Sequence, residues 1–245
     1  MRHPSLEHTA HRPWPLPVRS WIGRQTWNDL AFLHWRVPAR ILRSLVPASL
    51  EVEEFDGSGW VAITPFRMSG VALHGWPAVP GTSTFPELNV RTYVTRGERP
   101  GVWFFSLDAG NRLAVLAART VYHLPYIHAS MSTWRSGDRV EYRSDRSTGI
   151  GFHASYQPTG PVFRAPPGTL EHWLTERYCL YARSSSGGLY RAEIHHAPWP
   201  LQPATVRISQ NDMLAIHDLP DSAGPPLVHF AGRLDVVVWL PTRVG

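Results

Sequence analysis

The chain of 245 residues is 43% hydrophobic and carries 11 tryptophans, so it can bury a substantial core and is not expected to be disordered. Its 23 prolines and 19 glycines favour many turns and short strands over long helices. The single cysteine, Cys179, excludes an intrachain disulfide and favours a reducing compartment. No apolar run approaches the roughly 20 residues that cross a bilayer. Residues 1–20 also lack the apolar segment of a signal peptide, so we expect a cytoplasmic protein with no membrane partner.

All 24 basic residues are arginine, and the formal net charge is +5. Because the chain contains no lysine, none of its side chains can form a Schiff base with a carbonyl substrate. The arginines are scattered rather than gathered in basic runs, whereas a nucleic-acid face usually shows them clustered. We therefore expect no nucleic-acid partner, and whether the protein forms a homo-oligomer stays open.

Residues 1–20 are expected to form an irregular N-terminal arm, and residues 21–245 a single domain without repeats or linkers. A short amphipathic helix is predicted over 38–47, with Pro38 near its start and Pro47 ending it. The segment 59–68 has strand composition but contains a proline, which indicates an edge strand or a bulge.

Two strands, 85–94 and 101–109, are joined by a hairpin-like connection. The strongest helix signal covers 111–124. Asn111 can cap this helix, and Pro125 follows its end. Four residues share one of its faces: Leu113, Leu116, Ala117 and Thr120.

Three short strands between 129 and 157 predict a β-meander. A short helix or turn follows at 169–178, then a hairpin of 178–183 with 189–196, and finally a very apolar strand at 227–241. Together these elements predict an α+β protein that is mainly β. We expect a strongly bent antiparallel sheet or barrel with two or three short helices.

Polar and apolar residues alternate along 85–94, as they do when a strand has two different faces. One face carries Glu87, Asn89, Arg91 and Tyr93, and the other Leu88, Val90, Thr92 and Val94. From the alternation alone, the polar row can face either bulk water or a pocket.

The chemistry of this row favours a pocket. Four residues separate Glu87 from Arg91, about 13 Å along a strand, so the two cannot pair directly. A buried arginine is suited to hold a carboxylate or phosphate. A buried glutamate has a raised pKa and can serve as an acid or base.

The strands at 189–196 and 232–240 alternate in the same way, but one wet face of an antiparallel sheet gives an equal pattern. The 13 histidines form no HxH or HExxH motif. Neither GxSxG nor GxGxxG occurs, so we expect no metal and no cofactor. Tyr126 and His128 can either face a cavity or serve as packing residues.

Several blocks of the sequence resemble the YqjF-like family of uncharacterised proteins (domain of unknown function 2071). They include "NDLAFLHWRVPARILRSLVP", "FDGSGWVAITPFRM", "FPELNVRTYV", "GVWFFSLDAGNRLAVLAAR" and "LPYIHASM", and they run from about residue 20 to residue 204. This family is grouped with the acetoacetate decarboxylase-like superfamily. The resemblance implies a cone-shaped, bent β-barrel around a ligand cavity, with the polar face of 85–94 turned into it.

The resemblance also shows where this chain departs from the decarboxylase. The position of the Schiff-base lysine falls near Tyr126 and Ile127, and that of an N-terminal arginine falls at Asn28. One acidic pocket residue is retained as Glu87. Decarboxylation of acetoacetate through an imine is therefore not expected.

The leading hypothesis is a protein that binds a small anionic or oxygenated metabolite, with or without turnover. Arg91, Asn89 and Asn28 are predicted to bind the ligand, and Glu87 and Tyr126 to act in catalysis. Such an enzyme would be a lyase, isomerase or hydrolase that forms no Schiff base. The alternative is a structural or protein-interaction module whose barrel is filled by side chains, with Arg91 and Glu87 paired to neighbours.

Overall fold

The computed structural model describes residues 3–79, 81–220 and 224–245. Within these ranges the chain is mainly β-strand with three short α-helices, and the strands form a strongly bent sheet. This confirms the fold class predicted from the sequence. In the same ranges, no helix is both long enough and apolar enough to cross a membrane.

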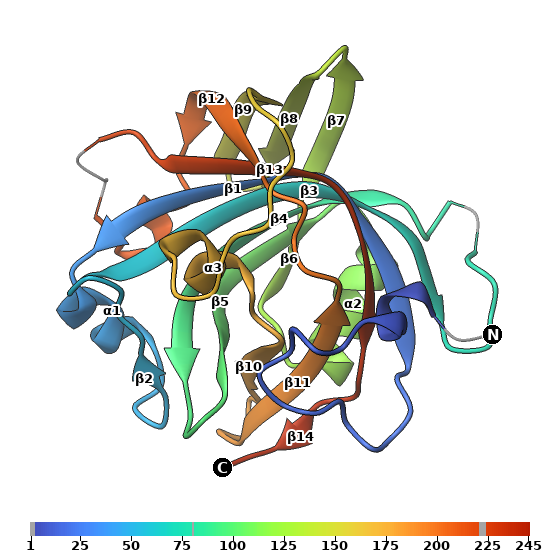
Figure 1. The fold of residues 1–245 in the computed structure, drawn as a ribbon. Helices are drawn as coiled ribbons and strands as arrows, with labels where there is room; N and C mark the ends of the chain where they lie inside the picture. The colour runs from blue at the N-terminus through green and yellow to red at the C-terminus, as the bar shows by residue number, and fades with distance from the viewer. Residues whose placement is uncertain (1–2, 80, 221–223) are drawn as a thin grey trace.

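The central part of the structure is a ring of strands (Figure 1). The strands of the ring follow one another in space in the order β11 (Leu189–His196), β10 (Cys179–Arg183), β5 (Pro100–Ala109), β4 (Phe85–Thr95), β3 (Gly59–Leu73), β1 (Gly23–Val37) and β13 (Leu227–Val238). The short strand β14 (Thr242–Arg243) lies beside β11. Residues 194–196 of β11 pair antiparallel with 236–238 of β13. This pairing closes the sheet on itself, so the ring has an inside and an outside.

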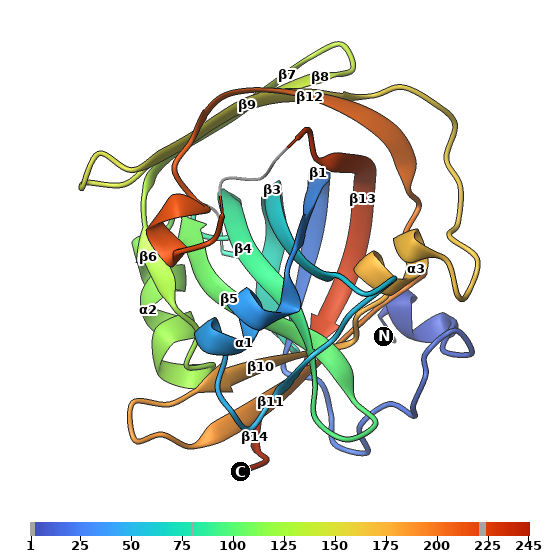
Figure 2. The same ribbon diagram turned by 90° about the vertical axis from the view of Figure 1, so that its left-hand side faces the viewer.

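A second layer crosses the outside of the ring (Figure 2). It consists of β12 (Gln202–Asn211), β9 (Gly151–Pro158), β8 (Arg139–Asp145) and β7 (Ser130–Ser136). The last three form the predicted meander. Apolar side chains from both layers, including Leu88, Val90, Tyr142 and Phe152, join in one buried cluster. The aliphatic face of β4 therefore belongs to the core between the two layers.

The predicted helices are present as α1 (Ala39–Leu45), α2 (Arg112–Val121) and α3 (Leu170–Thr175). The structure also has two short 3-10 helices, η1 (Pro4–Glu7) and η2 (Ala215–His217), and two short strands, β2 (Glu51–Val52) and β6 (Tyr126–His128). Asn111 caps α2 as predicted, because its Oδ1 accepts from the backbone N–H of Leu113 at 2.9 Å. The apolar face of α2, however, is not buried. The Leu113 and Leu116 side chains are 66% and 61% exposed, and Val115 is the buried residue of the helix.

Of the two alternatives predicted for 59–68, the edge strand is wrong, because β3 lies between β1 and β4. Its Pro65 is tolerated where the register of β1 against β3 shifts, between Asn28 and Leu33. Asp29 in this stretch has a φ of 50°. The expected bulge is thus confirmed. The same bulge interrupts the two-residue alternation of β1, which is why the sequence did not reveal this strand. The strand β12 was not predicted from the sequence either.

Residues 3–20 lie against β11, whereas residues 1 and 2 of the predicted arm lie outside the described residues. Arg12 forms a buried ion pair with Glu193, and the Trp14 Nε1 donates to the same carboxylate at 2.8 Å. His195 Nε2 lies 2.8 Å from the Ser5 carbonyl oxygen. The polar row of β11 is therefore covered by the N-terminal segment and does not line a pocket.

Candidate functional site

Three residues of the polar row of β4, Glu87, Asn89 and Arg91, line a cavity of about 780 Å³ inside the ring, and Phe85 lines it as well. The fourth residue of the row, Tyr93, is buried in a hydrophobic cluster and does not line the cavity. The opposite face of the strand is packed into the core between the layers. The structure thus resolves the alternatives left by the sequence: the row faces an interior space rather than bulk water.

The register of the sheet places these residues at successive depths. Phe66 lies opposite Glu87, Thr64 opposite Asn89, and Phe104 opposite Arg91. Residues on one face of a strand advance by about 7 Å, so Arg91 lies about 13 Å beyond Glu87. The Arg91 end is lined by buried residues and is the closed one, since Arg91, Phe104 and Arg177 are only 8%, 8% and 5% exposed. The other end is open, where the lining residue Trp76 is 71% exposed.

Arg91 is a buried cation without a charged partner. Among the described residues, no carboxylate lies within 4.0 Å of its guanidinium, and its Nε and Nη2 have no hydrogen-bond partner. The guanidinium carbon lies 5.2 Å from the ring centroid of Phe32 and 5.9 Å from that of Tyr93. Since an unpaired buried charge is costly, this end of the cavity is suited to receive an anion.

A second arginine at the closed end, Arg177, is largely satisfied by the protein. Its Nη1 pairs with Glu53, and its Nε donates to the Trp173 carbonyl oxygen at 2.7 Å. Its buried Nη2 lacks a partner. Sequence reasoning missed Arg177 because it follows a short helix, where no strand alternation marks the direction of its side chain.

Glu87 forms a hydrogen-bonded pair with Tyr126. The Tyr126 hydroxyl donates to the Glu87 Oε2 at 2.9 Å. Tyr126 reaches this position because β6 pairs in parallel with β5, which places Tyr126 beside Leu107. Both Glu87 and Tyr126 line the cavity.

Burial raises the pKa of the Glu87 carboxyl to about 8, and the hydrogen bonds from Tyr126 and Asn89 offset only part of this effect. Burial and the neighbouring Glu87 also raise the pKa of the Tyr126 hydroxyl well above its ordinary value. At neutral pH most molecules therefore hold both groups in their neutral, protonated form. Such a pair can donate a proton to a bound molecule.

Further polar atoms on the cavity wall are buried without partners. In the described ranges they are Thr64 Oγ1, Asn89 Oδ1, the Tyr122 hydroxyl and the indole nitrogens of Trp27 and Trp199. The two indole rings stack with centroids 5.6 Å apart. The alternation of β4 indicated Asn89, but sequence reasoning gave no signal for the other four.

Asn28, the remaining predicted binding residue, is not brought to this group. Its amide nitrogen donates to the Ser69 hydroxyl at 2.8 Å and to the Arg67 carbonyl oxygen at 3.1 Å. Its neighbour Trp27 takes the place on the cavity wall. A ligand-binding role for Asn28 remains a sequence-based prediction, to which this geometry adds no support.

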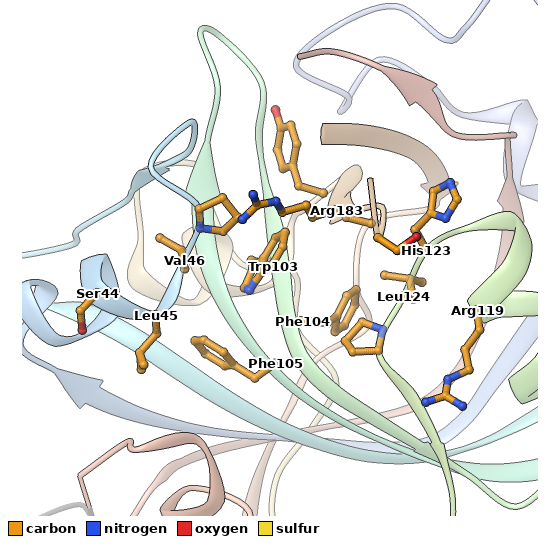
Figure 3. Close-up of a pocket in the computed structure, with 15 residues that line it drawn as sticks. Ser44, Leu45, Val46, Trp103, Phe104, Phe105, Arg119, His123, Leu124 and Arg183 are labelled. Carbon is orange, nitrogen blue, oxygen red and sulfur yellow. The ribbon is translucent and has the colours of Figure 1, made fainter. Parts of the chain in front are cut away.

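A second hollow, of about 670 Å³, lies on the outer side of β5. In Figure 3 its aromatic residues Trp103, Phe104 and Phe105 lie between the end of α1 and the segment that carries Arg119. Arg119 and Arg183 are exposed, so water can solvate their charges. No described lining residue has a buried polar atom without a partner. The inner cavity is therefore the stronger candidate site.

Solved structures with the same fold are enzymes of the acetoacetate decarboxylase type. The acetoacetate decarboxylase of Legionella pneumophila has a TM-score of 0.64 at 14% identity, over 98% of this chain and 95% of that chain. An acetoacetate decarboxylase-like enzyme of Sphingomonas wittichii RW1 has a TM-score of 0.66 at 14% identity, over 96% and 97%. The enduracididine biosynthesis enzyme MppR, complexed with pyruvate, has a TM-score of 0.66 at 11% identity, over 93% and 92%. At these identities the likeness shows the fold alone.

Sequence comparison shows a much closer relationship. The uncharacterized protein YqjF of Bacillus subtilis (strain 168) is 45% identical over 226 residues, which cover 91% of this chain and 93% of YqjF. Residues 24–235 match DUF2071, a family described as an uncharacterized conserved protein. With the ring of strands and its inner cavity, these matches show that the chain belongs to the DUF2071 family of YqjF-like proteins, on an acetoacetate decarboxylase-like fold.

Proposed function

We propose that this protein binds a small organic acid with one negative charge and holds its carboxylate on Arg91. The observation that carries the proposal is the buried guanidinium of Arg91. It lines the cavity, and no carboxylate of the described residues lies within 4.0 Å of it. Arg177 is compensated by Glu53, and Glu87 is mostly protonated at neutral pH. One positive charge therefore remains for the ligand to neutralise.

The Glu87–Tyr126 pair gives this site a means of acid–base chemistry. Protonated Glu87 donates a proton to the bound acid, and Tyr126 holds the carboxyl oriented by its hydrogen bond. No imine forms, because the chain has no lysine. The reactions compatible with this chemistry are those of a lyase, isomerase or hydrolase without a covalent intermediate. The pyruvate bound to MppR, a protein of the same fold, supports an organic acid as ligand.

A purely structural role is the less supported alternative. It requires a barrel filled by side chains, with Arg91 and Glu87 paired to charged neighbours. The cavity of about 780 Å³ and the unpartnered atoms of Arg91 both favour a ligand instead.

Binding is tested by titrating pyruvate and acetoacetate into the wild type and Arg91→Met by calorimetry. Methionine keeps the packing of the long side chain but removes the charge. We expect the variant to bind at least about 30-fold more weakly, the effect of truncating one partner of a buried charge pair. Arg207→Met, on an exposed side chain of β12, is the matched control and keeps wild-type affinity. Equal affinity in Arg91→Met would contradict the proposal.

Proton transfer is tested separately with Glu87→Gln. Glutamine keeps the size of the side chain and an oxygen that accepts from Tyr126. For an acid that the wild type converts, we expect binding within about threefold of wild type and turnover lower by about 100-fold or more. Undiminished turnover would make Glu87 a structural residue.

A further inference from the structure

Exposed apolar side chains gather at the open end of the cavity. Ten large hydrophobic side chains are exposed in the described ranges, and six of them line this cavity. The six are Leu73, Trp76, Val79, Leu113, Val121 and Leu240. Their exposed fractions run from 43% to 71%. A gathering of this kind marks a binding surface rather than a random distribution of surface residues.

The six residues come from three separate segments that meet at this rim. Leu73, Trp76 and Val79 belong to the end of β3 and the residues after it, Leu113 and Val121 to α2, and Leu240 to the residues after β13. This also explains the exposed apolar face of α2. Leu113 lines the cavity, whereas Leu116, on the same helix and almost equally exposed, does not.

The wall between the rim and Glu87 is apolar as well. It is formed by Met68, Val71, Phe85 and Ala114, all of which line the cavity. Beyond this wall the polar lining residues follow along β4 in the order Glu87, Asn89 and Arg91. The cavity thus changes from a mainly apolar mouth, with the exposed Arg24 at its rim, to a buried cationic end.

The size of the cavity exceeds what a very small acid needs. A volume of about 780 Å³ lies in the range of sites that enclose drug-sized ligands. From Arg91 the wall of β4 extends about 13 Å to Glu87 and roughly 7 Å more to Phe85. An acid of two or three carbons, bound to Arg91, does not extend to the apolar residues of the rim.

We infer that the ligand of this site is an amphiphilic monocarboxylate with a long acyl or aryl portion. Its carboxylate binds Arg91, the middle of the molecule passes Glu87 and Tyr126, and its apolar end lies between α2 and residues 73–79. The inference rests on the proposed function, because it assigns the anion to Arg91. It adds the length and the apolar character of the rest of the molecule.

The opposite orientation is disfavoured by the charges at the two ends. Arg24 is exposed at the rim and solvated, so it needs no ligand. An apolar end inserted first would bury itself against Arg91 and leave that cation uncompensated.

The test is calorimetry at pH 7 and constant ionic strength with saturated acids from acetate through butyrate, hexanoate and octanoate to decanoate, each below its micelle concentration. For the wild type we expect affinity to rise about two- to fourfold with each added methylene, as burial of a methylene predicts. Leu113→Glu should weaken decanoate binding by at least tenfold and change butyrate binding by less than twofold. The matched control Leu116→Glu should change neither.

The outcomes separate this inference from the proposed function. Affinity that depends on Arg91 but not on chain length would overturn the inference and leave the proposed function intact. If no acid binds, or if Arg91→Met binds decanoate like the wild type, both are overturned. Weaker decanoate binding in Arg24→Gln but not in Arg91→Met would reverse the orientation and overturn the inference. The inference would also be overturned if Leu113→Glu changed the oligomeric state, measured by light scattering, and left the chain-length dependence of binding unchanged.

Discussion

Two buried carboxylates on neighbouring strands, Asp108 on β5 and Glu87 on β4, lie on opposite faces of the same sheet. Asp108 pairs in register with Leu88, so it faces the core between the layers. Its side chain accepts from the Arg146 Nε and the Ser144 hydroxyl, both at 2.9 Å. Glu87 faces the cavity and, in the described part of the chain, has no cation beside it. The exposed fractions are nearly equal, 1% for Asp108 and 2% for Glu87.

The difference between the two faces lies in their partners rather than in their burial. On the core face the protein itself satisfies the charges, as in a structural ion pair. On the cavity face no described residue gives Arg91 a counter-charge, and burial keeps Glu87 neutral. This arrangement favours the binding of a ligand over the stability of the empty protein. What distinguishes the two faces is therefore the partner of the buried arginine, which Arg146 has in Asp108 and Arg91 does not have among the described residues.

The largest effect on stability is expected from breaking the buried Asp108–Arg146 ion pair on the core face. Asp108→Asn leaves the Arg146 charge buried without its partner and should lower the free energy of unfolding by about 3–5 kcal/mol. Chemical denaturation of the variant measures this loss. Adding Arg146→Met in the same chain should recover most of it, and a double variant as unstable as Asp108→Asn would contradict the closed-pair interpretation.

An effect of similar size concerns the pH dependence set by Glu87. Its pKa rises from 4.5 to about 8 on folding, so the folded state keeps a proton that the unfolded state releases. The stability contributed by this group is complete below pH 4.5 and is lost as the pH rises toward about 8. Glu87→Gln removes this loss. Across that window the variant should gain about 4 kcal/mol relative to wild type. Parallel stability curves from urea denaturation would show that the carboxyl is not held neutral.

The smallest effect on stability is expected from removing the charge of Arg91 on the cavity face. Arg91→Met removes an unpaired buried charge and should raise the free energy of unfolding of the ligand-free protein by about 1–2 kcal/mol. Thermal unfolding without ligand measures the change. A structural role for Arg91 predicts the opposite sign, so a lower melting temperature would contradict the comparison drawn above.

The sequence revealed those parts of the fold that depend on local pattern. The alternation of 85–94 separated an aliphatic face from a polar one, and Asn111 with Pro125 marked the helix between them. The strand β1 escaped detection because a bulge at Asp29 breaks its alternation. The position of β3 between two strands was not revealed either, since its proline allowed an edge strand as well as the bulge that the structure has.

By itself, the sequence determined that 85–94 has two chemically different faces and that no side-chain amine is available for covalent chemistry. Only the tertiary structure decided which face meets the cavity, that no described carboxylate pairs with Arg91 there, and that Tyr126 lies against Glu87. The reason is physical. Periodicity is a property of one strand, whereas the partner of a buried charge comes from strands far away in the sequence, and only the closure of the ring brings them together.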